Sequence, residues 1–358
     1  MEKGYYVRDI APGQEVVGIF VVSQASQGSA RNGLYWRLEL QDASGCMEAK
    51  IWHPLSAEFG DIPPGALVEA AGRGESWRGQ TQLNVTRLRL LDAEESAAFD
   101  QTTLLPQGPY DPQTMWEELT ALAEREFRHA PWRALVFSVL GKADVRAAFL
   151  LWPAAKSVHH AYTGGLLEHT LGVFNLCRRL ADLYPHLDRQ TLLAGALFHD
   201  IGKTEEFSGG IANDYTTSGR LLGHLELGLE MLAPHLAASG LEEYLQRHLK
   251  HLILSHHGEP DFGAARLPQT AEAFALHYAD NLDAKMAQCR GLFDQLTEDG
   301  QEWTSWQPTL GRHLYRSPRT PEEPAASADK SVETGADGDP SADEAAMQKK
   351  RREQLSFF

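Results

Sequence analysis

Histidine and aspartate side chains recur in this chain in a pattern that could hold divalent metal ions. The candidate ligands lie between residues 169 and 280, and they are His169, His199, Asp200, His224, His256, His257 and Asp280. No cysteine joins them, because Cys46, Cys177 and Cys289 are far apart and odd in number, which fits neither a disulfide framework nor a cysteine-rich zinc motif. Imidazole and carboxylate ligands without thiolates indicate a hydrolytic metal site rather than a structural zinc site.

The helices that must position these ligands should turn them toward the protein interior. A helical face recurs every three or four residues, so His169 shares a face with Val173, and His224 shares one with Leu221. His256 and Asp280 follow apolar residues at the same spacing, and the adjacent His199 and Asp200 can both turn inward at a helix end. Burying several unpaired ionisable groups is costly, and a divalent cation is the simplest partner that they could share.

Asp200 is the candidate that can bridge two ions, because a carboxylate has two oxygens whereas an imidazole offers one lone pair. We expect a first site made of His169, His199, Asp200 and Asp280, and a second made of Asp200, His224, His256 and His257. Two ions about 3.5–4 Å apart could activate a water and hold both oxygens of an in-line phosphoryl displacement. Whether one or two ions bind stays open, because adjacent histidines on a helix need not both be ligands.

Lys203 follows the His199-Asp200 pair by three residues, so its loop should lie beside the metals. Its ammonium group could hold a substrate phosphate as a point charge, and the alternative is a solvated lysine after a helix end. We assign Asp200 and Lys203 as the catalytic residues.

Residues 1–92 are expected to form strands, because apolar and polar residues alternate there with a period of two. Turn residues separate five candidate strands, at about 16–24, 33–41, 46–52, 66–76 and 80–91. Leu34, Trp36, Leu38 and Leu40 should share the inner face of the second strand. Five short strands with these turns predict a small closed barrel of the OB type.

Residues 112–316 are expected to form an all-α domain, which follows a linker over residues 93–111. Asp111 before Pro112 is a good helix start, and from there the apolar period changes to 3.6. Helices are predicted at about 112–127, 131–140, 143–150, 165–184, 189–199, 219–237, 241–257 and 268–297. The predicted fold is therefore multidomain, with an all-β barrel, an all-α domain and a tail over residues 317–358 that we expect to be disordered.

The outer face of the barrel offers aromatic and basic residues of the kind that bind single-stranded nucleic acid. The candidates are Arg31, Tyr35, Arg37, Lys50, Trp52, Trp77 and Arg78. Aromatic rings stack on bases without reading sequence, and arginines follow phosphates. The alternative is that Trp52 and Trp77 pack against the helical domain.

The composition is that of an ordinary globular protein, with 42% hydrophobic and 23% charged residues. A net charge of −16 argues against a surface coated with basic residues for duplex DNA. No apolar run approaches the roughly 20 residues that a membrane span needs, and we see no signal peptide. A cytoplasmic location is the plain expectation.

Several strings in the helical half resemble a known family. Phe198-His199-Asp200-Ile201-Gly202-Lys203 is the signature of the HD metal-dependent phosphohydrolases. The chain as a whole resembles the YhaM-type 3′→5′ exoribonucleases, which pair an OB-fold with an HD domain. The strings that carry this likeness are His159 to Thr170, Leu197 to Lys203, Ser255 to Glu259, Phe262-Gly263 and Glu272 to Lys285. Gly263-Ala264-Ala265-Arg266 departs from the Gly-Ser-Pro expected there.

The resemblance implies hydrolysis of single-stranded RNA, and often DNA, from the 3′ end with a divalent cation, typically manganese. Histidine-rich ligation also favours one or two Mn²⁺ ions, or another transition metal, over magnesium. His159, His160 and Tyr162 belong to the first string, and they either line the nucleotide pocket or cap a helix. Asp283 lies one helical turn after Asp280, and we expect it to support a ligand rather than to bind metal.

The last residues resemble the short motif by which bacterial proteins bind the replication sliding clamp. Gln354, Leu355, Phe357 and Phe358 would fill a polar notch and a hydrophobic groove. The alternative is an uninformative C-terminus. If the motif binds a clamp, the substrates include DNA at replication or repair sites.

Our leading hypothesis is a metal-dependent 3′→5′ exonuclease that releases nucleoside 5′-monophosphates from single-stranded RNA, with DNA as a further substrate. A second hypothesis is an HD phosphohydrolase for a small nucleotide, such as a cyclic dinucleotide or a nucleoside triphosphate. The Gly-Tyr-Pro element of the cyclic-dinucleotide enzymes is absent after His257, and the barrel would then have no clear role. A third is a single-strand-binding replication factor with a vestigial site, which the complete ligand set disfavours.

Overall fold

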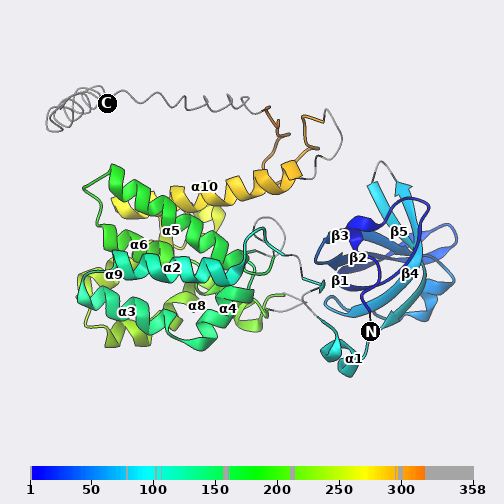
Figure 1. Ribbon diagram of the computed structural model, residues 1–358, viewed down its shortest axis with the longest axis horizontal. Coiled ribbons are helices and arrows are strands. Elements are labelled where there is room, and N and C mark those ends of the chain that lie inside the picture. The colour runs from blue at the N-terminus through cyan, green and yellow to red at the C-terminus, as the bar shows by residue number, and fades with distance from the viewer. Residues whose placement is uncertain are drawn as a thin grey trace, which may run out of the picture. The chain divides into compact units, whose positions relative to one another are not determined.

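The N-terminal part of the computed structural model is a closed five-stranded barrel, as the period-two pattern predicts (Figure 1). Its strands are β1 (Glu15–Ala30), β2 (Gly33–Asp42), β3 (Gly45–Ile51), β4 (Leu67–Trp77) and β5 (Gln80–Leu90), and they pair in the order β1-β2-β3-β5-β4. β1 pairs with β4 to close the barrel, and β3 and β5 are the parallel pair. This is a barrel of the OB type.

β1 extends well beyond its predicted end near residue 24, because it pairs with two neighbouring strands. Its first half pairs with β4 from Glu15 to Val21, and its second half pairs with β2 from Val21 to Ala30. The β1–β2 register shifts between Val22 and Gln24. Such an irregularity bends a strand and increases its twist, which lets one strand contribute to both sides of a barrel.

The inner face of β2 is as expected except at its first residue. Trp36, Leu38 and Leu40 are buried in the barrel core beside Met47 and Ala49 of β3. The prediction for Leu34 was wrong, because its side chain is 57% exposed. It stands at the start of β2, where the barrel no longer encloses a side chain.

The helical part follows the predicted order closely. Its longer helices are α2 (Pro112–Glu126), α3 (Ala130–Leu140), α4 (Ala143–Leu151), α5 (Gly165–Leu183), α6 (Arg189–Phe198), α8 (Thr217–Ala238), α9 (Glu243–Ser255) and α10 (Ala271–Asp294). Asp111 caps α2 as predicted, and its carboxylate accepts hydrogen bonds from the backbone N–H and the hydroxyl of Thr114.

Helices α5 and α6 lie at the centre of this part (Figure 1). Every residue from Gly165 to Leu171 of α5 and from Thr191 to Phe198 of α6 is buried. A helix segment that is buried all round must be covered by neighbours, and α5 packs against α2, α6 and α10 while α6 also packs against α9. Polar residues on or just after these two helices are therefore held in the interior.

Three features were not predicted. A short helix α1 (Ala93–Ala98) is capped by Asp92, and the following Phe99 and Leu104 are buried against barrel residues of β1 and β4. Helix α7 (Lys203–Glu206) follows the His199-Asp200 pair. Helix α8 is interrupted at Gly223, whose φ of 74° lies in the left-handed region.

The interruption at Gly223 corrects one expectation about α8. We expected Leu221 to share the inward face of His224, but Leu221 is 78% exposed. Because the backbone turns between the two residues, the helical spacing does not carry across Gly223. His224 therefore owes its inward position to the second segment of α8.

The structure describes residues 2–77, 80–100, 103–105, 107–155, 160, 162–209, 214–294, 296 and 301–318. The chain divides into one compact unit over Met1–Leu314 and another over Tyr315–Phe358. None of the helices in the described ranges combines the length and the apolar character needed to cross a membrane. The domain boundaries predicted near residues 92, 111 and 316 stay predictions, and nearly all of the predicted tail lies outside the described residues.

Candidate metal and substrate site

Five helical elements bring the predicted ligands to one place. His169 comes from α5, His199 and Asp200 follow α6, His224 comes from α8, His256 and His257 follow α9, and Asp280 comes from α10. His169, His199, Asp200 and His256 are almost fully buried. His169 and Asp280 are more than a hundred positions apart in the sequence, so only the helical packing could unite this set.

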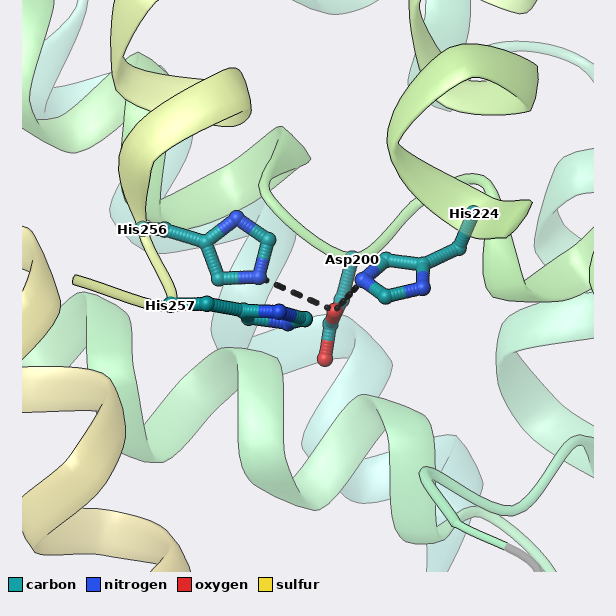
Figure 2. Close-up of side chains that lie close together, drawn as sticks. All are labelled: Asp200, His224, His256 and His257. Carbon is teal, nitrogen blue, oxygen red and sulfur yellow. Dashed lines mark ion pairs between the residues drawn. The ribbon is translucent and has the colours of Figure 1, made fainter. Parts of the chain in front are cut away.

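The two carboxylate oxygens of Asp200 face different groups of histidines. Oδ2 lies 3.5 Å from His169 Nε2 and 3.4 Å from His199 Nε2. Oδ1 lies 3.5 Å from His224 Nε2 and 3.6 Å from His256 Nε2. Figure 2 shows the imidazoles of His224, His256 and His257 gathered around Asp200. This division is the one that a bridging carboxylate needs.

Asp280 contacts the first group through His169. Its Oδ1 lies 3.1 Å from His169 Nε2, and His169 Nε2 lies 3.2 Å from His199 Nε2. Ligand atoms that each bind one ion at about 2.0–2.2 Å lie roughly 3–3.6 Å from one another in tetrahedral or octahedral geometry. The separations among His169, His199 and Asp200 and those in the second group therefore have the scale that a shared metal ion requires, while Asp280 belongs to a mutually close set with His199 and His256.

The second group contains polar atoms that the protein leaves unsatisfied. Among the described residues, Asp200 Oδ1, His224 Nε2 and His257 Nδ1 are buried and have no hydrogen-bond partner. Unsatisfied buried polar atoms are costly, and here they come from three residues that, with His256, can offer four mutually close ligand atoms. A divalent cation would satisfy these atoms, which the protein alone leaves without partners.

Further contacts orient the imidazoles so that Nε2 points at Asp200. The Nδ1 atoms of His199 and His256 lie 3.0 and 2.8 Å from the carbonyl oxygens of Ala196 and Ile253. A carbonyl accepts a hydrogen bond only from a protonated Nδ1, which leaves a lone pair on Nε2. His169 Nδ1 contacts Asp283 Oδ2 at 2.8 Å, so the geometry agrees with the supporting role expected of Asp283.

Glu206 supports His224 in the same way, and sequence reasoning missed it. Its Oε1 lies 3.2 Å from His224 Nδ1 and accepts a hydrogen bond from the His224 backbone N–H. The only signal in the sequence was a carboxylate a few residues after the His199-Asp200 pair. That signal is weak, because the adjacent Glu205 is also a carboxylate and is exposed, so the sequence alone does not tell the two residues apart.

The charges of the cluster shift the pKa values of its members in opposite directions. Burial lowers the pKa of His169, but hydrogen bonds to Asp280 and Asp283 outweigh it and raise that pKa to about 10. Burial and the neighbouring His256 and His224 lower the pKa of His257 to about 3. Burial raises the pKa of Asp200, but Lys203 and His199 bring it well below the usual value. The carboxylate at the centre is thus ionised, as a ligand must be.

Lys203 lies in the cluster rather than in solvent. Its Nζ is 2.7 Å from Asp200 Oδ2, and its side chain is largely buried. The structure therefore disfavours the solvated alternative, while the phosphate-binding role stays a prediction. In this arrangement the ammonium group balances the charge of the same oxygen that faces His169 and His199.

The close approach of α8 requires the glycine that follows the His199-Asp200 pair. A Cβ atom at Gly202 would overlap the carbonyl oxygen of His224 and the backbone nitrogen of Gly228. Both atoms belong to the backbone of α8, which cannot yield as a flexible side chain can. The glycine thus permits α8 to come close enough to Asp200 for His224 to reach it.

A cavity of about 300 Å³ opens beside the cluster. The predicted residues that line it are His169, Asp200, Lys203, His256, His257 and Asp280, and the others are Phe262, His277, Asn281, Ala284 and Lys285. Spacing and residue type alone assigned no role to this second set, although it includes His277 and Asn281. His277 Nδ1 contacts the carbonyl oxygen of His256 at 2.8 Å and so supports the α9 end.

His160 and Tyr162 do not line this cavity. His160 is buried with its Nε2 3.8 Å from Asp283 Oδ2, and it borders a neighbouring cavity of about 450 Å³. Tyr162 donates a hydrogen bond to Glu168 at 2.7 Å and accepts one from Arg290 at 2.9 Å. Their predicted role in a nucleotide pocket stays a prediction, and His159 lies outside the described residues.

Four of the barrel candidates lie together. The rings of Tyr35 and Trp52 are 4.8 Å apart, and the ammonium of Lys50 lies 5.8 Å from the Trp52 ring and 5.6 Å from the Trp77 ring. Trp52 and Trp77 are 39% and 57% exposed. This continuous aromatic and cationic surface has the composition that single-strand binding needs.

The remaining candidates are less closely grouped. Arg37 forms an ion pair of 2.6 Å with Glu48, which also pairs with Lys50. Arg31 lies exposed at the turn between β1 and β2. Arg78 and the tail motif of Gln354, Leu355, Phe357 and Phe358 lie outside the described residues.

Comparisons with known proteins agree with this picture. The sequence model of the HD domain matches residues 166–285. The chain is 34% identical to 3′-5′ exoribonuclease YhaM of Bacillus subtilis over 80% of this chain and 89% of that protein. It is 33% identical to the protein of the same name from Oceanobacillus iheyensis, over 80% of this chain and 88% of that one.

Solved structures that resemble the chain include the second OB-fold domain of replication protein A from Methanococcus maripaludis. The TM-score is 0.22 at 19% identity, covering 25% of this chain and 94% of that one. A single-stranded DNA binding protein from Thermus aquaticus gives a TM-score of 0.21 at 20% identity, covering 22% of this chain and 40% of that one. From the sequence identity and coverage of its relatives, the chain belongs to the YhaM family.

Proposed function

We propose that this protein is a metal-dependent 3′→5′ exonuclease that shortens single-stranded RNA to nucleoside 5′-monophosphates. Membership in a family whose relatives are named 3′-5′ exoribonucleases supports the reaction class. The observation that carries the proposal is the division of donors around Asp200, with unsatisfied buried atoms on the Oδ1 side. Single-stranded DNA is a further substrate in the proposal.

In this proposal two divalent ions would share Asp200, and we propose Mn²⁺ as the native ion because imidazole ligands favour transition metals. His169, His199, Asp200 and Asp280 would hold the first ion, and Asp200, His224, His256 and His257 the second. Bound ions of this kind supply Lewis acidity toward a phosphoryl oxygen and an activated water. The protein contributes the geometry: five helical elements hold the ligands, and the cavity beside them would receive a phosphodiester.

Two further parts of the proposal concern Lys203 and the barrel. Lys203 would place its positive charge near the phosphoryl group undergoing attack. The Tyr35, Lys50, Trp52 and Trp77 surface, together with Arg31, Arg37 and Arg78, would hold the strand upstream of its 3′ end. We also place the protein in the cytoplasm with its RNA substrates, and we include contact of the tail with a sliding clamp in the proposal.

The decisive experiment is a time course on a 5′-labelled single strand with Mn²⁺, comparing the native chain with Asp200→Asn. The variant should lose hydrolysis by at least about 1,000-fold, because a neutral amide cannot bridge two cations, while strand binding should survive. Metal content measured on the purified proteins should fall with activity. Prior removal of metal from the native protein should have the same effect, reversible on adding Mn²⁺.

Asp261→Asn is the matched control, because Asp261 is an exposed carboxylate in the turn after His257 and does not line the cavity. It should retain native turnover and native metal content. Native-like turnover in Asp200→Asn would refute the metal assignment. Released fragments longer than one nucleotide, or release of the 5′ label as a mononucleotide at the start of the reaction, would refute the 3′→5′ exonuclease assignment.

A further inference from the structure

Phe262 is an exposed aromatic residue at the edge of the metal cavity. Its side chain is 67% exposed, yet it lines the same cavity as Asp200, His257 and Asp280. Single exposed apolar residues are common on protein surfaces, so the exposure by itself indicates nothing. What distinguishes Phe262 is its position in the lining of a cavity whose deeper wall is made of candidate metal ligands.

The turn that carries Phe262 is tied to the ligand pair His256-His257. The backbone N–H of Glu259 donates to the carbonyl of His257, and the N–H of Phe262 donates to the carbonyl of Glu259, both at 3.0 Å. Gly263 has a φ of 96°, and a Cβ atom there would lie 3.1 Å from His257 Nδ1. The turn thus lies against His257, and its backbone is joined by hydrogen bonds to the ligand pair.

Lys285 supplies a cation to the same cavity. It is exposed on α10 and, among the described residues, it forms no ion pair, whereas Lys203 is paired with Asp200. An aromatic face beside an unpaired ammonium group matches a base and a phosphate of a single strand. The cavity volume of about 300 Å³ has the scale of one nucleotide.

We propose that Phe262 stacks on the base of the 3′-terminal nucleotide and that Lys285 pairs with a phosphate of the same strand end. This subsite rests on the proposed function and adds the way in which the end is held. Stacking needs no particular base, so it positions any sequence.

The test compares two 5′-labelled RNA strands that differ only at the 3′ end, where one has a base and the other an abasic ribose. Removal of the first nucleotide should be about 5- to 150-fold more efficient for the base-bearing strand, in kcat/KM, with the native protein. Phe262→Ala should lower kcat/KM on the base-bearing strand by the same factor and leave the abasic strand unchanged. Phe262→Trp should preserve the preference.

Phe274→Ala is the matched control, because Phe274 is a 50% exposed phenylalanine on α10 that does not line the cavity. It should keep the native preference. A base preference that persists in Phe262→Ala would overturn the inference, as would a loss on both strands alike with a native melting temperature. If the native protein shortens neither strand from its 3′ end, the proposed function itself fails and the inference falls with it.

Lys285→Ala tests the phosphate contact separately. It should lower kcat/KM on both strands and reduce the slope of log(kcat/KM) against log salt by about 0.7, the value for one phosphate of a single strand. Lys250→Ala removes an exposed lysine of α9 that does not line the cavity, and it should leave the slope unchanged. An unchanged slope in Lys285→Ala would overturn this half of the proposal.

Discussion

At the scale of single residues, the carboxylates behind the histidines matter as much as the ligands. His169 is backed by Asp283 and His224 by Glu206, through their Nδ1 atoms. A carboxylate at this place fixes the ring orientation and increases the basicity of Nε2. The candidate metal site is therefore wider than the seven predicted ligands.

Glu206→Gln should weaken metal binding at the second site by about 10- to 100-fold, because the amide supports the His224 imidazole less well. Titration of the metal-free protein with Mn²⁺ measures the effect, and saturating Mn²⁺ should restore most of the activity. Glu205→Gln changes the exposed neighbour and should leave affinity native. Equal affinities for the two variants would contradict the role of Glu206.

At the scale of elements, a partly buried ion-pair network joins α2, α5 and α6. Glu126 at the end of α2 accepts hydrogen bonds from Arg178 of α5 at 3.0 Å and from Arg189 of α6 at 2.8 Å. The side chain of Glu126 is only 10% exposed. Because α5 carries His169 and α6 leads into His199, this network stabilises the arrangement of two ligand-bearing helices.

The network predicts a pH-dependent contribution to stability. Burial raises the pKa of Glu126, but Arg189 and Arg178 outweigh it and lower the pKa below the ordinary value. A lowered pKa in the folded state stabilises it fully above the unfolded pKa of about 4.3, and this stabilisation is lost as the pH falls through the folded value. Glu126→Gln should therefore cost about 1–3 kcal/mol at pH 7 and much less at pH 3.

Urea unfolding of both proteins across this pH range provides the measurement. Glu124→Gln is the control, because Glu124 is an exposed carboxylate two residues before Glu126 on the same helix. A destabilisation by Glu126→Gln that is equal at pH 7 and pH 3 would show that the charge of Glu126 is not its cause.

At the scale of the whole molecule, the barrel and the helical part have separate hydrophobic cores. In the proposed function, the barrel binds the strand and the metal cluster hydrolyses it. The rate of hydrolysis of a substrate too short to reach both should then be unaffected by substitutions on the barrel surface.

Trp52→Ala tests this division. It should weaken binding of a long single strand by about 5- to 150-fold, since one stacking platform is lost, and leave hydrolysis of a dinucleotide unchanged. Fluorescence anisotropy and a dinucleotide assay measure the two effects. Tyr244→Ala removes a 65% exposed aromatic residue of α9 and should change neither. An equal loss for dinucleotide and long strand would argue that Trp52 supports the fold rather than the strand.

The sequence by itself determined the element types, because the periods of 2 and 3.6 differ and the two halves keep them consistently. It also indicated the metal-binding chemistry, since histidine and aspartate are costly to bury together at interior positions unless they share a cation. The start of α2 at Asp111-Pro112 could be placed for a local reason, an N-cap followed by a proline.

Only the tertiary structure decided which residues meet. The interruption at Gly223 places Leu221 and His224 on different faces. It depends on the backbone conformation of one residue, which the spacing of apolar residues does not reveal. Glu206, Phe262 and Lys285 lie at the site because of how the elements pack, and helical spacing alone assigned none of them a role there. Local patterns specify helices and strands, but the pairing of distant side chains follows from packing, which depends on the whole chain at once.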